Sequence, residues 1–294
     1  RGCADLVVGG PPCQGFSVAG KMDPNDPRSR HVFDFLAMVE RVQPKAFVME
    51  NVKALARNKR WAGTIADIRA QAEKIGYKIY LEVLNSADYG VPQMRERMFL
   101  VGFKDEAVEY TYPEPAVEHH VGVAEALRSL PALGEPGNDQ TCKAKVTAAK
   151  EPILRQSPFA GMLFNGQGRP MDMSRPAPTL PASMGGNRTP IVDQETLETG
   201  TKQWVETYHD SLMNGGEIIT QIPSRLRRIS VQEAAAIQSF PQDMPWHGSQ
   251  SSRYRQIGNA VPPKMAYAVA NSVSKALGYA LDTQESLLTR IATN

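Results

Sequence analysis

A cysteine on a stiff loop is the residue of this chain best suited to chemistry. Cys13 lies in the stretch GGPPCQGFS at residues 9–17, directly after an apolar run at residues 5–8 that predicts a buried strand. Ligands and reacting groups gather beyond the strand ends of an open α/β sheet. A thiol placed there can attack a substrate when a neighbouring group activates it, so the sequence predicts a nucleophile.

A carboxylate follows a second predicted strand. Glu50 comes directly after the apolar residues 46–49, within the run MENV. Because parallel strands end at the same edge of a sheet, we expect Cys13 and Glu50 to emerge together. A thiol and a carboxylate suit a reaction in which one attacks a ring and the other holds or donates a proton. The alternative is a surface glutamate beside an asparagine turn.

Two arginines, two residues apart, form a third candidate group. Arg95 and Arg97 lie at the start of a strand predicted at residues 98–102, and side-chain alternation would send both to one face. Paired guanidinium groups there could bind carboxylates, phosphates or the carbonyl of a base. An exposed, charged edge strand would show the same pattern.

A fourth candidate is the run GNAVPP at residues 258–263, which predicts a Gly-Asn turn before a helix led by proline. The N–H groups at such a turn could bind an anionic group. Many helices begin in this way, so the pattern is weak when taken alone.

The elements that must position these groups alternate between strand and helix. Apolar spacing predicts helices over 30–42 and 63–75, and strands over 77–84 and 98–102. This alternation indicates a mainly parallel sheet covered by helices. From about 114 to 221, frequent Pro, Gly and Ser/Asn/Thr clusters indicate a smaller, loop-rich domain. Order returns with a capping box opening at Ser230 and a last helix from about Pro262 to Leu277.

Composition adds limits rather than a function. The chain has 294 residues, of which 41% are hydrophobic and 22% charged, and its net charge is +2, so any nucleic-acid surface must be a local patch. The three cysteines have no metal-ligand spacing and suggest no disulfide framework, which favours a reduced, intracellular compartment and no metal site. The sequence shows no signal peptide and no apolar run of membrane-spanning length, so we expect no membrane partner.

Together, and in this order, four motifs resemble those of bacterial DNA (cytosine-5) methyltransferases. They are PPCQ at 11–14, ENV at 50–52, QMRER at 93–97 and GNAVP at 258–262. NSADYG at 85–90, RRIS at 227–230 and QSFP at 238–241 also look like the family. The resemblance covers about 5–103 and 225–277, while 177–180 and 184–190 look like a target-recognition domain. It implies an α/β, doubly wound S-adenosylmethionine-dependent methyltransferase sheet, N-terminally incomplete, with a smaller loop-rich target-recognition domain.

The resemblance assigns a role to each catalytic candidate. Cys13 would add to carbon 6 of the target cytosine, while Glu50 would contact ring nitrogen 3 and the exocyclic amine. Arg97 would steady the ring carbonyl, with Arg95 beside it. Addition at carbon 6 makes carbon 5 nucleophilic enough to take the methyl group of S-adenosylmethionine, and loss of the carbon-5 proton then expels the thiolate. The base must first be flipped out of its stack.

The partner that the resemblance implies is double-stranded DNA. We interpret residues 15–30 as a mobile loop over the DNA. Within and beside this loop the candidate contacts are Gln14, Ser17, Lys21 and Arg28. In the middle region the candidates for reading bases in the major groove are Arg169, Asn187, Arg188 and Thr189. Arg228 is a further candidate for DNA binding.

The resemblance is least complete in the residues that bind the methyl donor. The Gly-rich loop and two acidic residues that hold S-adenosylmethionine in the family have no match in this chain. The donor contacts that remain are Pro12, Gly258, Asn259 and Ala260. We therefore expect an N-terminal segment or a second chain to complete the cofactor site.

The expected domains are 1–113 for part of the catalytic domain, 114–222 for target recognition with its connecting segments, 223–280 for the return to the catalytic domain and 281–294 for a tail. One alternative is a tRNA cytosine-5 methyltransferase, against which the long middle region argues because it is large enough to read a groove. Another is an inactive DNA-binding fragment or subunit. The resemblance further implies a restriction-modification setting in the bacterial cytoplasm, associated with the nucleoid.

Overall fold

The computed structural model describes residues 4–12, 15–16 and 27–279, and it shows two compact units. The first unit comprises Arg1–Asn85, Glu96–Ala116 and Tyr267–Thr283, and the second comprises Ser86–Arg95, Val117–Ala266 and Gln284–Asn294. Residues 223–266 thus pack with the second unit, whereas we expected the return to the catalytic domain at 223. None of the helices described is long and apolar enough to span a membrane.

The first unit is built on a four-stranded sheet of order β1-β2-β5-β3. β1 (Leu6–Gly9) pairs in parallel with β2 (Ala46–Val52), while β5 (Glu96–Phe103) runs antiparallel to both β2 and β3 (Lys78–Asn85). The sheet is therefore mixed, with β1, β2 and β3 sharing a direction and β5 opposing them. The link from β3 to β5 contains no crossover helix, and such a link joins antiparallel rather than parallel neighbours.

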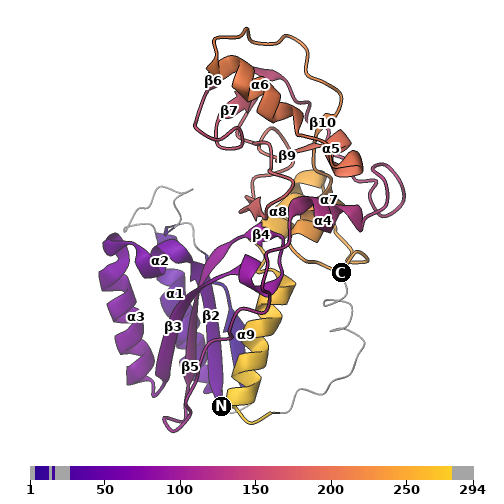
Figure 1. Cartoon of the computed structure of the whole chain (residues 1–294). Coiled ribbons are helices and arrows are strands. Elements are labelled where there is room, and N and C mark those ends of the chain that lie inside the picture. The colour runs from indigo at the N-terminus through magenta and orange to yellow at the C-terminus, as the bar shows by residue number, and fades with distance from the viewer. Residues whose placement is uncertain (1–3, 13–14, 17–26, 280–294) are drawn as a thin grey trace. The chain divides into compact units, whose positions relative to one another are not determined.

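Strand alternation gives this sheet two apolar faces. α1 (His31–Val42), α2 (Lys53–Arg57) and α3 (Ala62–Lys74) contribute to one core, where Phe47 and Met49 are fully buried. Short 3₁₀ turns precede α1 and α3 at Pro27–Arg30 and Lys59–Trp61. On the other face, the Tyr110 hydroxyl lies 2.9 Å from that of Ser272 in α9 (Pro263–Ala276), which runs beside the sheet in Figure 1.

The predicted helices and strands of this unit are confirmed, with shifts at their ends. β2 continues to Val52, so Glu50 lies inside the strand rather than after it. β5 begins at Glu96, so Arg97 also lies inside a strand. Both functional candidates are thus held by ladder hydrogen bonds, which position a side chain more firmly than a loop does.

The second unit consists of short elements. Three two-stranded sheets pair β4 (Gln93–Met94) with β8 (Ala177–Pro178), β6 (Ala148–Ile153) with β7 (Met162–Phe164), and β9 (Ile191–Asp193) with β10 (Leu226–Arg228). The helical elements of the unit are η3 (Ser86–Tyr89), α4 (Val123–Arg128), α5 (Gln194–Thr199), α6 (Trp204–Met213), α7 (Val231–Ile237) and α8 (Gln250–Asn259). One core joins residues of α4, α7 and α8 with Met171 and Leu180, which explains why 223–266 belong here.

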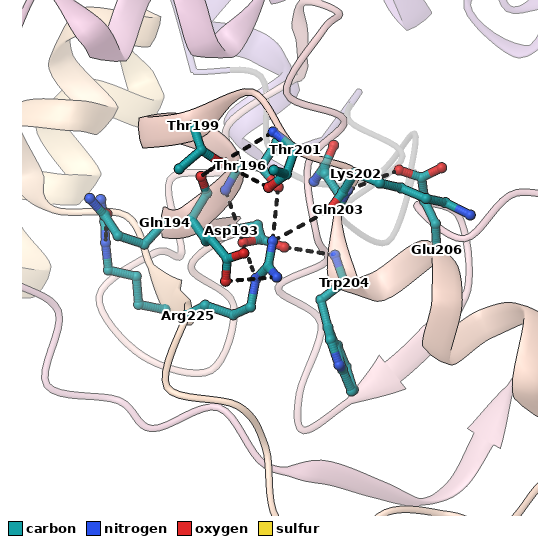
Figure 2. A network of polar contacts seen from close by, with 12 residues as sticks. Asp193, Gln194, Thr196, Thr199, Thr201, Lys202, Gln203, Trp204, Glu206 and Arg225 are labelled. Carbon is teal, nitrogen blue, oxygen red and sulfur yellow. Dashed lines mark hydrogen bonds and ion pairs between the residues drawn. The ribbon is translucent and has the colours of Figure 1, made fainter.

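Buried polar groups hold these short elements together. The Asp193 carboxylate, fully buried, accepts hydrogen bonds from Arg225 Nε at 2.6 Å and from the backbone N–H of Trp204 at 2.8 Å and Thr196 at 3.3 Å (Figure 2). It thereby caps α5 and ties it to the start of α6. The capping box predicted at Ser230 is confirmed, because Ser230 and Glu233 exchange both expected hydrogen bonds at the start of α7.

Candidate active site

The ends of β1 and β2 bring a loop and a carboxylate together in the first unit. Gly9 is opposite Met49 in the parallel register, so Gly10 lies next to Glu50. A Cβ atom on Gly10 would approach Glu50 Oε2 to 3.2 Å, a tight contact that glycine avoids. Residues 10–12 therefore leave the sheet beside Glu50, as expected. Cys13 and Gln14, which come next, lie outside the described residues, as do Ser17 and Lys21.

Glu50 is paired with Arg97. The Arg97 Nε atom lies 3.0 Å from Glu50 Oε1, and only 14% and 17% of the Arg97 and Glu50 side chains are exposed. Val52 is opposite Arg97 in the antiparallel register of β2 and β5, and Glu50 lies two residues before Val52 on the same face of β2. The side chains of Glu50 and Arg97 are therefore diagonal neighbours within reach of each other. A charge-assisted hydrogen bond of this kind restricts the carboxylate, so its oxygens can present a fixed acceptor to a bound ring.

Asn51, which the sequence reasoning did not single out, holds the start of the loop. Its buried side chain donates from Nδ2 to the carbonyl of Pro11 at 3.1 Å and accepts the N–H of Val52 at 2.9 Å. The ENV motif contains this residue, so the signal was present, although nothing in the sequence indicated its partner. Pro12, a predicted donor contact, is exposed.

Arg95 does not act beside Arg97. Its side chain is 1% exposed, and it donates to the carbonyls of Gly258 at 2.9 Å and Leu180 at 3.5 Å within the second unit. The predicted alternation fails because Arg95 lies at the break between β4 and β5, before the regular strand begins. Arg95 therefore binds the negative, C-terminal end of α8 instead of a ring carbonyl.

The predicted anion-binding turn at 258–260 is also wrong. Gly258 and Asn259 are the last residues of α8, and the N–H of Ala260 donates to the Ile257 carbonyl at 3.2 Å. Glycine is required at 258 because a Cβ atom there would lie 2.6 Å from the Cα atom of Ala182. The N–H groups of this run are thus committed to a helix end, and α9 begins only at Pro263.

The predicted DNA contacts of the second unit divide by burial. Arg169, Asn187 and Arg188 are exposed, and Arg188 donates to the Ser183 hydroxyl at 3.3 Å. Thr189 is fully buried, and its hydroxyl accepts the N–H of Gly185 at 2.9 Å, so it cannot reach a base.

Arg228 is likewise a structural residue rather than a DNA contact. It is 3% exposed and donates to the Thr189 carbonyl at 2.6 Å and to Asn165 Oδ1 at 3.0 Å, while burial lowers its pKa. The sequence showed a basic residue but not the face of β10 to which it points. Arg28 lies in the 3₁₀ turn Pro27–Arg30, and its side chain is outside the description.

A basic groove in the second unit was missed by the sequence reasoning. It has a volume of about 330 Å³ and is lined by residues 141–146, 222–224 and 226–228, none of which is acidic. Lys143 and Lys145 are exposed, whereas Cys142, Ala144 and Val146 between them are half-buried. This alternation directs both ammonium groups to one side. The signal was the spacing of two lysines, two residues apart, in the alternating run TCKAKV at residues 141–146.

Comparison with known proteins identifies the class. A family model for C-5 cytosine-specific DNA methylase matches residues 2–275, and the chain belongs to this family. It is a DNA cytosine-5 methyltransferase, and members of its family use S-adenosylmethionine as the methyl donor.

Individual relatives are bacterial enzymes. The chain is 34% identical over 278 residues to the type II methyltransferase M1.HphI of Haemophilus parahaemolyticus, covering 92% of this chain and 68% of the relative. It is 30% identical over 284 residues to the type II methyltransferase M.FnuDI of Fusobacterium nucleatum, covering 93% and 77%.

Solved structures show the same fold. A prophage-encoded protein of E. coli, described as a DNA modification methyltransferase, matches with a TM-score of 0.62 and 20% identity over 93% of this chain and 79% of its own. The Dnmt2 methyltransferase of S. pombe matches with a TM-score of 0.63 and 15% identity over 94% and 79%.

Proposed function

We propose that this chain methylates carbon 5 of cytosine within a specific short sequence of duplex DNA through a covalent adduct with Cys13. The observation that carries the proposal is the Glu50–Arg97 ion pair beside the loop that leaves β1 at Gly10. A carboxylate held at this position can face a ring that the next loop residues attack. The bacterial type II relatives support the choice of DNA as the substrate.

The chemistry assigned to the chain's own residues starts with the thiolate of Cys13. Its sulfur forms a bond to carbon 6, and the electrons of the 5,6 double bond make carbon 5 an enamine carbon. Glu50 accepts the hydrogen bond of the exocyclic amine and holds the proton at ring nitrogen 3, while Arg97 fixes the carboxylate and steadies the ring carbonyl. S-adenosylmethionine, when bound, supplies the methyl group. Loss of the carbon-5 proton then restores the double bond and expels the thiolate.

The second unit supports the choice of DNA as the partner. Its groove carries Lys143 and Lys145 without an acidic neighbour in the lining, a composition suited to phosphates. The exposed Arg169, Asn187 and Arg188 supply donors and acceptors for bases. Replacing both lysines by Gln should make the negative slope of log affinity against log salt shallower by about 2. It should weaken binding to all DNA sequences alike. Lys150→Gln, outside the groove, is the matched control. An equal slope in both variants would show that the groove does not bind DNA phosphates.

We propose that the binding site for S-adenosylmethionine requires a further strand beside β1. Among the described strands β1 pairs only with β2, and Val8 on β1 is 67% exposed. An exposed, apolar strand edge is a site for pairing with another strand. An N-terminal segment or a second chain would supply that strand together with the missing donor contacts. Calorimetry on residues 1–294 alone should show weak binding of S-adenosylmethionine or none, and tight stoichiometric binding would contradict this proposal.

The decisive experiment uses an oligonucleotide with 5-fluorocytosine at the target position, which traps the adduct because fluorine cannot leave as a proton does. With the donor site completed, the wild-type chain should form a covalent complex, and Cys13→Ala should bind the DNA without forming one. Parallel assays on tRNA test the alternative substrate. Absence of transfer to either would favour the inactive DNA-binding subunit. We further propose that the chain acts on nucleoid DNA in the bacterial cytoplasm.

A further inference from the structure

An aromatic pair holds the chain at Phe16, three residues after Cys13. Phe16 and Trp61 are 0% and 1% exposed, and their rings meet edge to face with centroids 4.9 Å apart and planes at 86°. Both belong to the core that α1, α2 and α3 share with the sheet. An edge-to-face pair has a preferred geometry beyond its buried area, so it restricts where Phe16 can lie.

The turn that presents Trp61 is itself restrained. Trp61 ends the 3₁₀ turn Lys59–Trp61, its N–H donates to the Asn58 carbonyl at 2.9 Å, and the Asn58 side chain accepts the N–H of Arg60 at 3.0 Å. α3 starts at the next residue. The indole therefore projects from a turn whose backbone is held by hydrogen bonds of its own.

The indole contributes through its shape. Trp61 Nε1 is buried and has no hydrogen-bond partner among residues 4–12, 15–16 and 27–279. A buried N–H without a partner costs free energy, which a phenyl or aliphatic side chain would avoid. What the ring gives in return is the broad surface against which Phe16 packs.

A described residue on each side of Cys13 is thus held by a contact of its own. Before Cys13, the Asn51 side chain holds the Pro11 carbonyl; after it, Trp61 holds Phe16. We propose that Trp61 is a positioning residue for Cys13, because it holds Phe16, three residues after the nucleophile, in the core. This inference rests on the proposed role of Cys13. It assigns to Trp61 no contact with DNA or the donor.

The test replaces Trp61 by Leu and by Phe in the full chain. In the complemented enzyme, Trp61→Leu should form the 5-fluorocytosine adduct at least about tenfold more slowly, because small misplacements of reacting groups cost rate steeply. Its affinity for DNA should change much less than this rate, since the phosphate contacts proposed at Lys143 and Lys145 lie in the second unit. Trp61→Phe, which keeps an edge-to-face ring, should recover most of the rate.

Two controls separate positioning from general loss of stability. Trp246 packs on Phe240 with the same centroid distance of 4.9 Å and angle of 86° in the second unit, and Trp246→Leu should leave adduct formation unchanged. Ile68→Val trims the same core as Trp61, from α3. If Ile68→Val slows adduct formation as much as Trp61→Leu at equal loss of melting temperature, or if Trp61→Leu reacts at the wild-type rate, the proposal is wrong.

A second readout does not depend on methyl transfer. The rate at which iodoacetamide alkylates Cys13, followed by peptide mass spectrometry, should change several-fold in Trp61→Leu and remain unchanged at Cys142 of the second unit. Equal alkylation rates at Cys13 in the variant and wild type would overturn the positioning role. Failure of the wild-type chain to form the adduct, with altered alkylation in Trp61→Leu, would instead count against the proposed function alone.

Discussion

The two units use arginine in opposite ways. In the first unit, Arg97 projects from a regular strand and pairs with Glu50, and both side chains remain partly exposed. In the second unit, Arg95 and Arg228 are almost fully buried and donate to backbone carbonyls. An arginine within a recognisable motif is therefore a functional candidate in one unit and a structural tie in the other.

The difference follows from the backbone. In the first unit long strands satisfy one another's carbonyls, so polar side chains can point to a ligand. In the second unit the strands have two to six residues, and the carbonyls of Leu180, Gly258 and Thr189 accept hydrogen bonds from arginine side chains. Buried carbonyls must find a donor, and long side chains such as arginine and glutamine supply it. Gln238, for example, donates to the Ile257 carbonyl at 2.7 Å.

The sharpest way to break this comparison is at Glu50. Glu50→Gln should lower the single-turnover rate of methyl transfer by about a hundredfold or more, since a carboxylate acting on a proton contributes at this scale. Its melting temperature should change little. Glu96→Gln is the matched control, because Glu96 forms an exposed ion pair with Lys53 at 2.6 Å on the same unit. Equal rates of methyl transfer in the two variants would show that Glu50 does not act in the active site.

At Arg228 the expected effect is on stability. Arg228→Met leaves the Thr189 carbonyl without its side-chain donor and removes one of the two donors to Asn165 Oδ1, which should cost roughly 1–3 kcal/mol of unfolding free energy. Denaturant unfolding measures this cost, and DNA affinity per folded molecule should not change. A variant with wild-type stability but weakened DNA binding would show that Arg228 contacts DNA and would contradict its structural role.

At Arg188 the expected effect is on sequence discrimination. This exposed residue should contribute on the order of 1 kcal/mol to the preference for the target over random duplex, at the lower end for an arginine–guanine contact. Competition binding with Arg188→Ala measures the ratio of the two affinities. Unchanged discrimination would reduce Arg188 to a tether of its own loop through Ser183.

The smallest effect is expected at the surface pair that joins β1 to β2. Lys45 Nζ lies 2.9 Å from Asp5 Oδ1, and its hydrogen bond lowers the pKa of the exposed Asp5 carboxyl. A lowered pKa in the folded state stabilises it above the carboxyl's ordinary pKa, and this gain is lost as pH falls through the lowered value. The melting temperatures of wild type and Asp5→Asn should therefore differ slightly at pH 7 and converge in acid. A difference independent of pH would show that the ion pair is not its cause.

Features that depend on residues close together in sequence could be predicted from the sequence pattern. The apolar periods of the first unit predicted α1, α3 and the strands of its sheet, because burial of one face repeats with the period of the element itself. The same periods indicated that Glu50 and the loop before Cys13 lie at one edge of the sheet. The capping box at Ser230 could be read for the same reason, since all its hydrogen bonds lie within one helical turn.

Contacts between distant residues were decided only by the tertiary structure. Whether Arg95 faces a substrate or the end of α8 depends on a helix more than a hundred residues away in the chain, and nothing near Arg95 encodes it. The burial of Thr189 and Arg228, the antiparallel course of β5 and the packing of Phe16 on Trp61 have the same origin. The chain alone thus determined its elements, its family and the chemistry of its motifs. The fold decided which polar groups remain available, because a side chain's partner is set by the packing of segments that the sequence keeps apart.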